Sequence, residues 1–226
     1  MAIVANTIIA DAAKLLQDDT NVAWPADELL RWLNAGQREI VLGKPDAYVQ
    51  NKAVLLVPGT KQTIPDDGNV FMKLTRSMGV DGLTPGPVPL PIPVQVLNEQ
   101  NPNWHSAPSK VAPIHYSFDE RDQKHYYVYP PQPFGPGFVE IVYSATPPDA
   151  TLAGPIAVSD LFQSALLDYI LYRAYSKDSE YTRNDGKADN YYKAFVGLLV
   201  GKSNGESKND AANNAIGNQR AGKKMA

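Results

Sequence analysis

The chain of 226 residues contains no cysteine. That absence excludes disulfide scaffolds, thiolate nucleophiles, iron–sulfur clusters and cysteine-ligated zinc. Long apolar runs are also missing, since no stretch approaches the ~18 consecutive apolar residues that a membrane-spanning helix needs. The N-terminus lacks the basic segment that opens a signal peptide. We therefore expect a protein that is made and kept in an aqueous compartment.

The chain also lacks an excess of positive charge. Its 21 Lys and Arg residues face 24 Asp and Glu residues, which gives a formal net charge of −3. A protein that mainly grips phosphate backbones needs a basic surface, so nucleic-acid binding as the principal function is disfavoured. A hydrophobic content of 43% is typical of a soluble globular protein with a buried core.

Proline is nearly confined to the middle of the chain. Of 19 prolines, 17 lie between Pro58 and Pro155, and none follows. Because proline breaks helix interiors, helices are expected only towards the two ends. Helical spacing of apolar residues predicts four of them, with Leu161 among the inward-facing residues. The first follows the possible caps Asn6 and Thr7, and the second runs from Pro25 to Gly43. The third runs from the cap Ser159 to about Lys177, and the fourth follows Asn184 or Asp185.

From Asn51 to about Ala145 the period changes to two, which predicts strands. The β-rich runs are Ala53–Val57, Gln62–Ile64, Val70–Leu74, Pro113–Phe118, His125–Tyr129 and Phe138–Tyr143. We expect a hairpin turn at Pro58-Gly59-Thr60 and pairing of Tyr126–Tyr129 with Phe138–Tyr143. Proline at every second position from Pro85 to Pro93 predicts an edge strand or an arm, never a central strand.

These patterns predict an α+β fold: a helical bundle of N- and C-terminal helices with a Pro-rich β-strand insertion and an extended C-terminal tail. The expected boundaries are 1–50 and 151–200 for the bundle, 51–150 for the insertion and 201–226 for the tail. The tail has no aromatic residue, so we expect it to order only on a partner. It carries +3, which leaves −6 for residues 1–200.

No motif indicates catalysis. The run Gly201-Lys202-Ser203 resembles the end of a phosphate-binding loop, but it lacks the upstream glycine and follows a helix. His105, His115 and His125 lack the spacing of metal ligands. Adjacent acidic residues fall at helix ends and turns. We therefore predict no enzymatic activity, no cofactor and no metal.

Aromatic residues concentrate late in the β-rich region, where acidic residues outnumber basic ones. A base-stacking platform for nucleic acid needs a positive groove, so a core or a protein interface is favoured. The candidates for a subunit or tail interface are Tyr126, Tyr127, Tyr129 and Phe138.

Several segments resemble, in order, the head-to-tail adaptor (connector) proteins of short-tailed, podovirus-type bacteriophages. The similarity covers about residues 5–200. The segments are Trp24–Ala47, Gly59–Pro65, Pro102-Asn103-Trp104, His125–Pro131, Glu140–Pro148 and Leu171–Asp178. No single motif is diagnostic, but the ordered set is much more specific than any member.

The resemblance implies a structural virion protein in the phage neck, present in the host cytoplasm during assembly. It implies a homo-oligomeric ring of twelve copies beneath the portal protein, with tail (nozzle or fibre) proteins attached and no membrane contact. Double-stranded DNA would pass through without specific binding. The tail would bind portal grooves through Lys202, Lys208, Asn209, Arg220, Lys223 and Lys224. Another virion or tail interaction module, or a nucleic-acid-binding protein, is the alternative.

Overall fold

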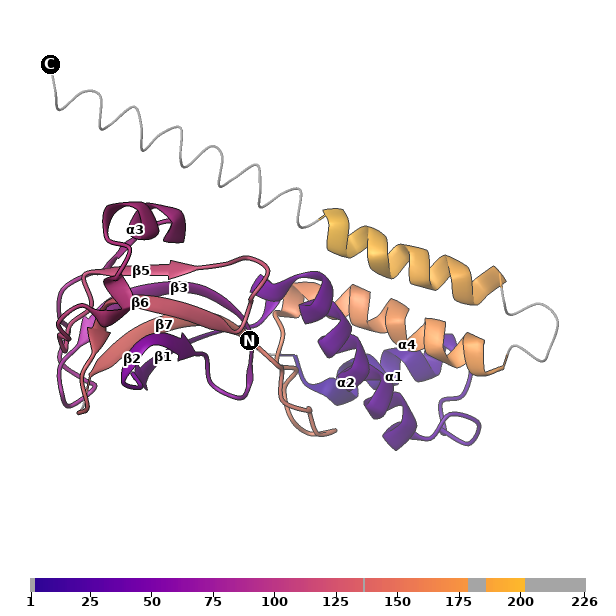
Figure 1. Cartoon of the computed structure of the whole chain (residues 1–226). Coiled ribbons are helices and arrows are strands. Elements are labelled where there is room, and N and C mark those ends of the chain that lie inside the picture. Colours follow the sequence, from indigo (N-terminus) through magenta and orange to yellow (C-terminus); the bar gives the residue numbers. More distant parts are fainter. Residues whose placement is uncertain (1–2, 136, 179–185, 202–226) are drawn as a thin grey trace, which may run out of the picture. The chain divides into compact units, whose positions relative to one another are not determined.

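The computed structural model describes residues 3–135, 137–178 and 186–201 (Figure 1). The chain has a mixed α+β fold, as predicted, with five helices and two sheets in these ranges. It divides into two compact units. We call Met1–Lys44 with Pro147–Ala226 the helical unit, and Pro45–Thr146 the β unit.

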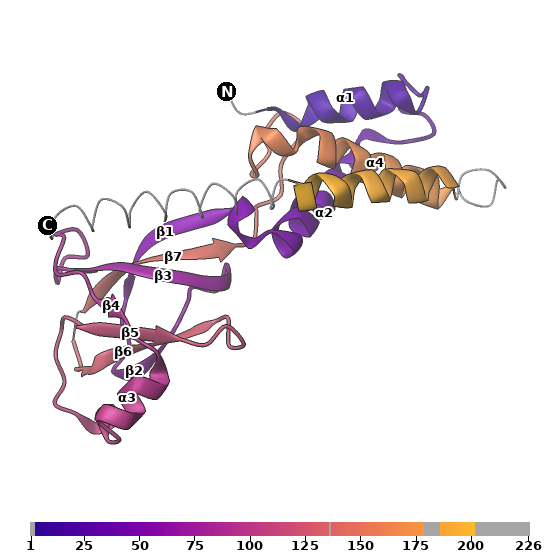
Figure 2. The ribbon, with the colours of Figure 1, turned by 90° about the horizontal axis from the view of Figure 1, so that it is seen from above.

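The helical unit brings together segments from both ends of the chain. Helices α1 (Ala5–Leu15), α2 (Ala26–Gly43) and α4 (Gln163–Lys177) pack against one another. Figures 1 and 2 both show a further helix, 186–201, running beside α4. Gly36 allows a close approach of α4, since a Cβ there would lie 3.0 Å from the Tyr169 ring.

A buried polar pair on α2 holds the returning chain. The Asn34 side chain donates to the Ala150 carbonyl at 3.1 Å and accepts from the Ala150 amide at 2.9 Å. The Gln37 amide donates to Asn34 Oδ1 at 3.0 Å, and its oxygen accepts from the Ala157 amide at 2.6 Å. These bonds satisfy backbone groups that have no helix or strand partner.

Asn34→Ala should lower the free energy of unfolding by about 2–3 kcal/mol, because it leaves the buried backbone groups of Ala150 unpaired. Urea denaturation measures the effect. Asn51→Ala, which removes an exposed bond to Glu140, is the control and should cost no more than about 0.5 kcal/mol. Equal stability of the two variants would contradict the role of the buried pair.

Some local details of the helices differ from the prediction. Asn6 and Thr7 do not cap α1, which begins at Ala5, because carbonyls of Gly154 and Leu152 accept its first amides. Leu161 is 76% exposed, since Asp160–Phe162 forms a 3₁₀ turn (η3) that changes the angular spacing before α4. Ser159 does cap this turn through the Leu161 amide. The alternative caps Asn184 and Asp185 lie outside the described residues.

The β unit contains two sheets. The first has the order β1-β7-β3 and the second the order β2-β6-β5-β4. Short helical segments connect the strands: η1 (Pro45–Ala47), α3 (Val94–Gln100) and η2 (Trp104–Ser106). The expectation of helices only towards the two ends was wrong for α3, because the chain between Pro93 and Pro102 contains no proline to interrupt a helix. The strands are β1 (Val49–Leu55), β2 (Gly59–Thr63), β3 (Gly68–Met78), β4 (Leu90–Pro91), β5 (His115–Phe118), β6 (His125–Gln132) and β7 (Phe138–Ala145).

The core of the β unit joins side chains from both sheets. The Phe71 ring of β3 stacks on the Tyr126 ring of β6, with centroids 4.5 Å apart. Val128 of β6 and Ile141 of β7 are fully buried. Each sheet therefore buries one face against the other, as the alternating pattern predicts.

Two predicted pairings are wrong. Pro58-Gly59-Thr60 is not a hairpin turn, because β1 pairs with β7 and β2 pairs with β6. The chain changes sheets there, and the Leu56 amide donates to the Gly137 carbonyl at 2.8 Å. Strands β6 and β7 likewise lie in different sheets and do not pair with each other. Alternation indicates which face of a strand is buried, but it carries no information about the neighbouring strand.

Candidate functional site

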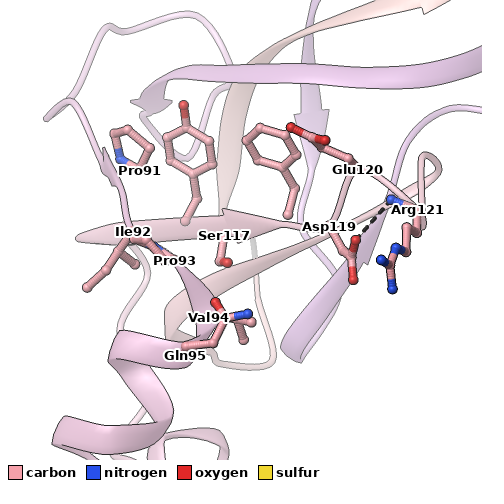
Figure 3. A pocket seen from close by; sticks show the side chains of 11 residues that line it. Pro91, Ile92, Pro93, Val94, Gln95, Ser117, Asp119, Glu120 and Arg121 are labelled. Carbon is pink, nitrogen blue, oxygen red and sulfur yellow. Dashed lines mark hydrogen bonds between the residues drawn. The ribbon is translucent and has the colours of Figure 1, made fainter.

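The β unit has a cavity of about 600 Å³ beside β4, the start of α3, β5 and the turn that follows β5 (Figure 3). Figure 3 shows Asp119, Glu120 and Arg121 at one end and Pro91, Ile92 and Pro93 at the other. Tyr116 and Phe118 add aromatic surface. The cavity thus combines apolar walls with a charged rim. The lining residues are Pro91, Ile92, Pro93, Val94, Gln95, Tyr116, Ser117, Phe118, Asp119, Glu120 and Arg121.

Two smaller cavities of about 260 Å³ each share Phe118, Asp119 and Asp122. Phe118 is 41% exposed. Asp119 shapes the turn, since its carboxylate accepts from the Arg121 amide at 2.9 Å, and Asp122 lies 2.6 Å from His125 Nδ1. We call the surface around these cavities the Phe118 hollow. It suits an apolar group flanked by positive charge.

The Phe118 hollow has no arrangement suited to catalysis within the described residues. Its acidic residues stand on an exposed turn, and no hydrogen bond joins Ser117, the serine of its lining, to His105, whose Nδ1 lies beside Thr60 Oγ1 instead. Burial raises the pKa of the Tyr116 phenol, which therefore stays neutral. The chemistry available here is binding through shape, apolar contact and charge.

The four predicted interface aromatics do not form one surface. Tyr126 is 1% exposed and belongs to the core, where burial raises its pKa. Tyr127 and Tyr129 are half-buried on the other face of β6, beside Trp104. Phe138 is half-buried in the first sheet.

Trp104 is a core residue that the alternating apolar pattern of the sequence does not indicate. It is fully buried and donates from Nε1 to Asn98 Oδ1 at 2.8 Å. Its ring stacks on the His105 ring, with centroids 3.7 Å apart. It fixes η2 over β6 and supports the position of Tyr127. A tryptophan following Pro102-Asn103 in a turn was the available signal.

The three histidines have separate environments. His105 Nδ1 is 2.7 Å from Thr60 Oγ1, His125 pairs with Asp122, and His115 stacks on Tyr129. Across the ranges that the structure describes, no three His, Cys, Asp or Glu side chains gather as a metal site requires. In those ranges no helix combines the length and apolarity needed to cross a membrane.

The helical unit has its own surface feature, a cavity of about 320 Å³ between the end of α2 and helix 186–201. Leu42 and Val200 on its border are 78% and 54% exposed. Phe195 lines this cavity and packs against Tyr169 of α4, with ring centroids 5.2 Å apart. Exposed apolar side chains at this density are typical of protein contact surfaces.

The family model of the SU10 adaptor protein matches residues 5–219, which cover the β unit and most of the helical unit. The chain belongs to this family. Membership confirms the predicted resemblance to phage adaptors and gives the protein a structural adaptor role in the virion. None of the curated proteins compared with the chain matches it.

For an adaptor, the described surfaces are of the kind that contact proteins. The predicted portal-binding residues cannot be placed among them, because Lys202, Lys208, Asn209, Arg220, Lys223 and Lys224 lie outside the described residues.

Proposed function

We propose that this adaptor joins the capsid to the tail as a ring of twelve copies beneath the portal protein. The family match over nearly the whole chain is the observation that carries the proposal. Two surfaces suited to protein contact, one in each unit, are consistent with a protein that binds more than one partner. The genome passes through the ring, and tail proteins attach on the far side from the portal.

Each part of the chain has a separate task in this proposal. The bundle segments 1–50 and 151–200 form the ring wall near the portal, and residues 51–150 face the phage tail. The C-terminal segment of the chain, 201–226, orders on portal grooves. Tyr127, Tyr129 and Phe138 retain exposed surface for a neighbouring subunit or a tail protein.

Native mass spectrometry of the purified protein, with and without its cognate portal, tests the proposal. The expected result is a complex of one portal assembly with twelve adaptor copies. Binding to a purified tail protein but never to the portal would instead favour a tail interaction module. Binding to neither would contradict the adaptor position in the neck.

The positive charges near the C-terminus should contribute to portal attachment. Replacing Arg220, Lys223 and Lys224 by glutamine should weaken attachment and make it less salt-dependent, because each exposed charge contributes about 0–1 kcal/mol and is screened by salt. Sedimentation with portal at several salt concentrations measures both effects. Glutamine at exposed Lys14, Lys61 and Lys124 removes the same charge from the body and serves as control. Equal losses in the two variants would contradict a specific role for the tail.

The assembled ring should not hold duplex DNA. Residues 1–200 carry a net charge of −6, and a ring multiplies that charge around the passage. We expect no retention of duplex by the portal-bound, tail-occupied ring at ~150 mM salt in a filter-binding assay. Tight binding under those conditions would show a basic passage and contradict the prediction.

A further inference from the structure

The outer strands of the two sheets differ in how their edges are protected. The edges are formed by β1 and β3 in the first sheet and by β2 and β4 in the second. An unprotected edge carries free amides and carbonyls that can pair with another strand, and proteins usually block such edges. In the part of the β unit that the structure describes, three of the four edges are blocked or short.

The alternating prolines block the β4 edge. We call residues Pro85–Pro93 the proline arm. The amides of Leu90 and Ile92 point inward and donate to carbonyls of Ile114 and Tyr116 at 2.9 Å. The positions between and beside them are prolines, which have no amide hydrogen to offer on the outer side. A further strand cannot find donors along this edge.

The same arm also covers part of β3, and Figure 2 shows β4 lying between β3 and β5. The Gly86 amide donates to the Ser77 carbonyl, and the Ser77 amide donates to the Pro87 carbonyl, both at 2.8 Å. Nearer the start of β3, the Phe71 amide donates to the Gln123 carbonyl at 2.7 Å. The chain's own segments therefore occupy the β3 edge.

The β2 edge is short. Strand β2 has five residues and an irregular register between Gly59 and Lys61. The Ile64 amide donates to the Lys124 carbonyl next to β6, so Lys61 and Thr63 direct their backbone groups outward. A short, irregular edge with an exposed lysine is a usual form of protection against strand addition.

Strand β1 has an open edge. The Tyr48 carbonyl accepts from the Ala145 amide and the Leu56 amide donates to Gly137, so even-numbered residues direct their backbone groups towards β7. The odd-numbered residues direct their backbone groups outward. All four have exposed, uncharged side chains, and none of them is a proline. In the described ranges, none of the backbone hydrogen bonds outside the strand ladders reaches them. They are Val49, Asn51, Ala53 and Leu55.

We propose that β1 receives an extended, proline-free segment of another virion protein, which becomes the fourth strand of the first sheet. Main-chain hydrogen bonds to the four outward residues would provide affinity, and contacts with Val49 and Leu55, which are 38% and 58% exposed, would favour apolar side chains at matching positions. That the partner comes from the virion rests on the proposed function. The proline arm directs strand addition to this one edge by closing the opposite side.

A second copy of this chain does not fit the edge within a ring. Its β3 and β4 edges are blocked in the same way, and β2 is short. Pairing of β1 with β1 is the same contact on both copies, so it closes a dimer and leaves no edge for continuing around a ring. The proposed function assigns the proline-free residues 201–226 of every copy to the portal, so we take a different polypeptide as the occupant.

Hydrogen exchange resolved to single amides by mass spectrometry tests the proposal, on the full-length free protein and on purified virions. The amides of Val49, Asn51, Ala53 and Leu55 should exchange freely in the free protein and be protected roughly 100-fold or more in virions. The inward amides of Lys52 and Val54 should be protected in both and serve as the internal control. Unchanged exchange at the outward amides in virions would overturn the proposal.

Ala53→Pro removes one outward donor without touching a bond to β7. We expect it to keep its far-UV circular dichroism and its portal binding, but to reduce complete particles roughly tenfold or more. Ala53→Ser keeps the amide and should assemble normally. Normal assembly of Ala53→Pro would overturn the proposal. Outward amides of the free protein that are protected at high concentration and exposed on dilution would assign the edge to a second copy and also overturn it.

The two proposals fail differently. A ring bound to the portal whose β1 edge still exchanges freely in virions would remove only the strand-addition proposal. A protein that is missing from virions would overturn both.

Discussion

Tyr126→Ala should lower the free energy of unfolding of the β unit by roughly 3–5 kcal/mol, while Tyr127→Ala should cost about 1–2 kcal/mol. The neighbours face opposite sides of β6. Tyr126 stacks on Phe71 in a core that admits no solvent, so alanine leaves a cavity. Tyr127 packs edge-on against Trp104 and keeps part of its surface in solvent.

Urea denaturation of the two variants compares these costs. The adjacent positions are matched in residue type, strand and local backbone, so a difference reports burial alone. For the fraction of each variant that folds, the ranking of the two effects should reverse in particle assembly. Tyr127→Ala should reduce the joining of subunits or tail proteins by more than its loss of stability explains. A normal yield of complete tails from Tyr127→Ala, or unfolding as severe as for Tyr126→Ala, would make Tyr127 a purely structural residue.

Removal of residues from Gly205 onward should abolish portal attachment and leave a folded, soluble protein. The described helix 186–201 ends before the cut, so no buried apolar side chain of the described residues is lost. In the proposed ring, the C-terminal tails of many copies would bind one portal, and loss of all of them would remove the gain in effective concentration. We therefore expect attachment to fail as a whole rather than to weaken gradually.

Sedimentation or electron cryo-microscopy of portal mixed with the truncated protein measures this effect. Truncation after Gly222 removes Lys223 and Lys224 but keeps most of the segment, and it should retain partial attachment. A full ring still bound beneath the portal after removal from Gly205 would show that the helical unit carries the attachment. Unfolding of the truncated protein, measured by circular dichroism, would contradict the independence of the two parts.

Much of the secondary structure could be predicted because its causes are local. The run from Leu29 to Ile40 repeats at helical spacing and forms the buried face of α2. Proline at every second position determined that Pro85–Pro93 could lie only at an edge, and β4 does. Leu161 was misplaced because a 3₁₀ turn and an α-helix differ in angular spacing by an amount that a short apolar pattern cannot resolve.

The sequence by itself determined the α+β class, the places of the long helices and of most strands, and the absence of thiol chemistry, since each depends on residue type or on short-range periodicity. It did not indicate α3. Only the tertiary structure decided that β1 pairs with β7 rather than β2, that Tyr126 is core while Tyr127 retains solvent contact, and that the proline arm spans the edges of two sheets. Those features depend on contacts between residues far apart in the chain. Several pairings would bury the same alternating side chains, so the choice among them follows from the packing of the whole unit.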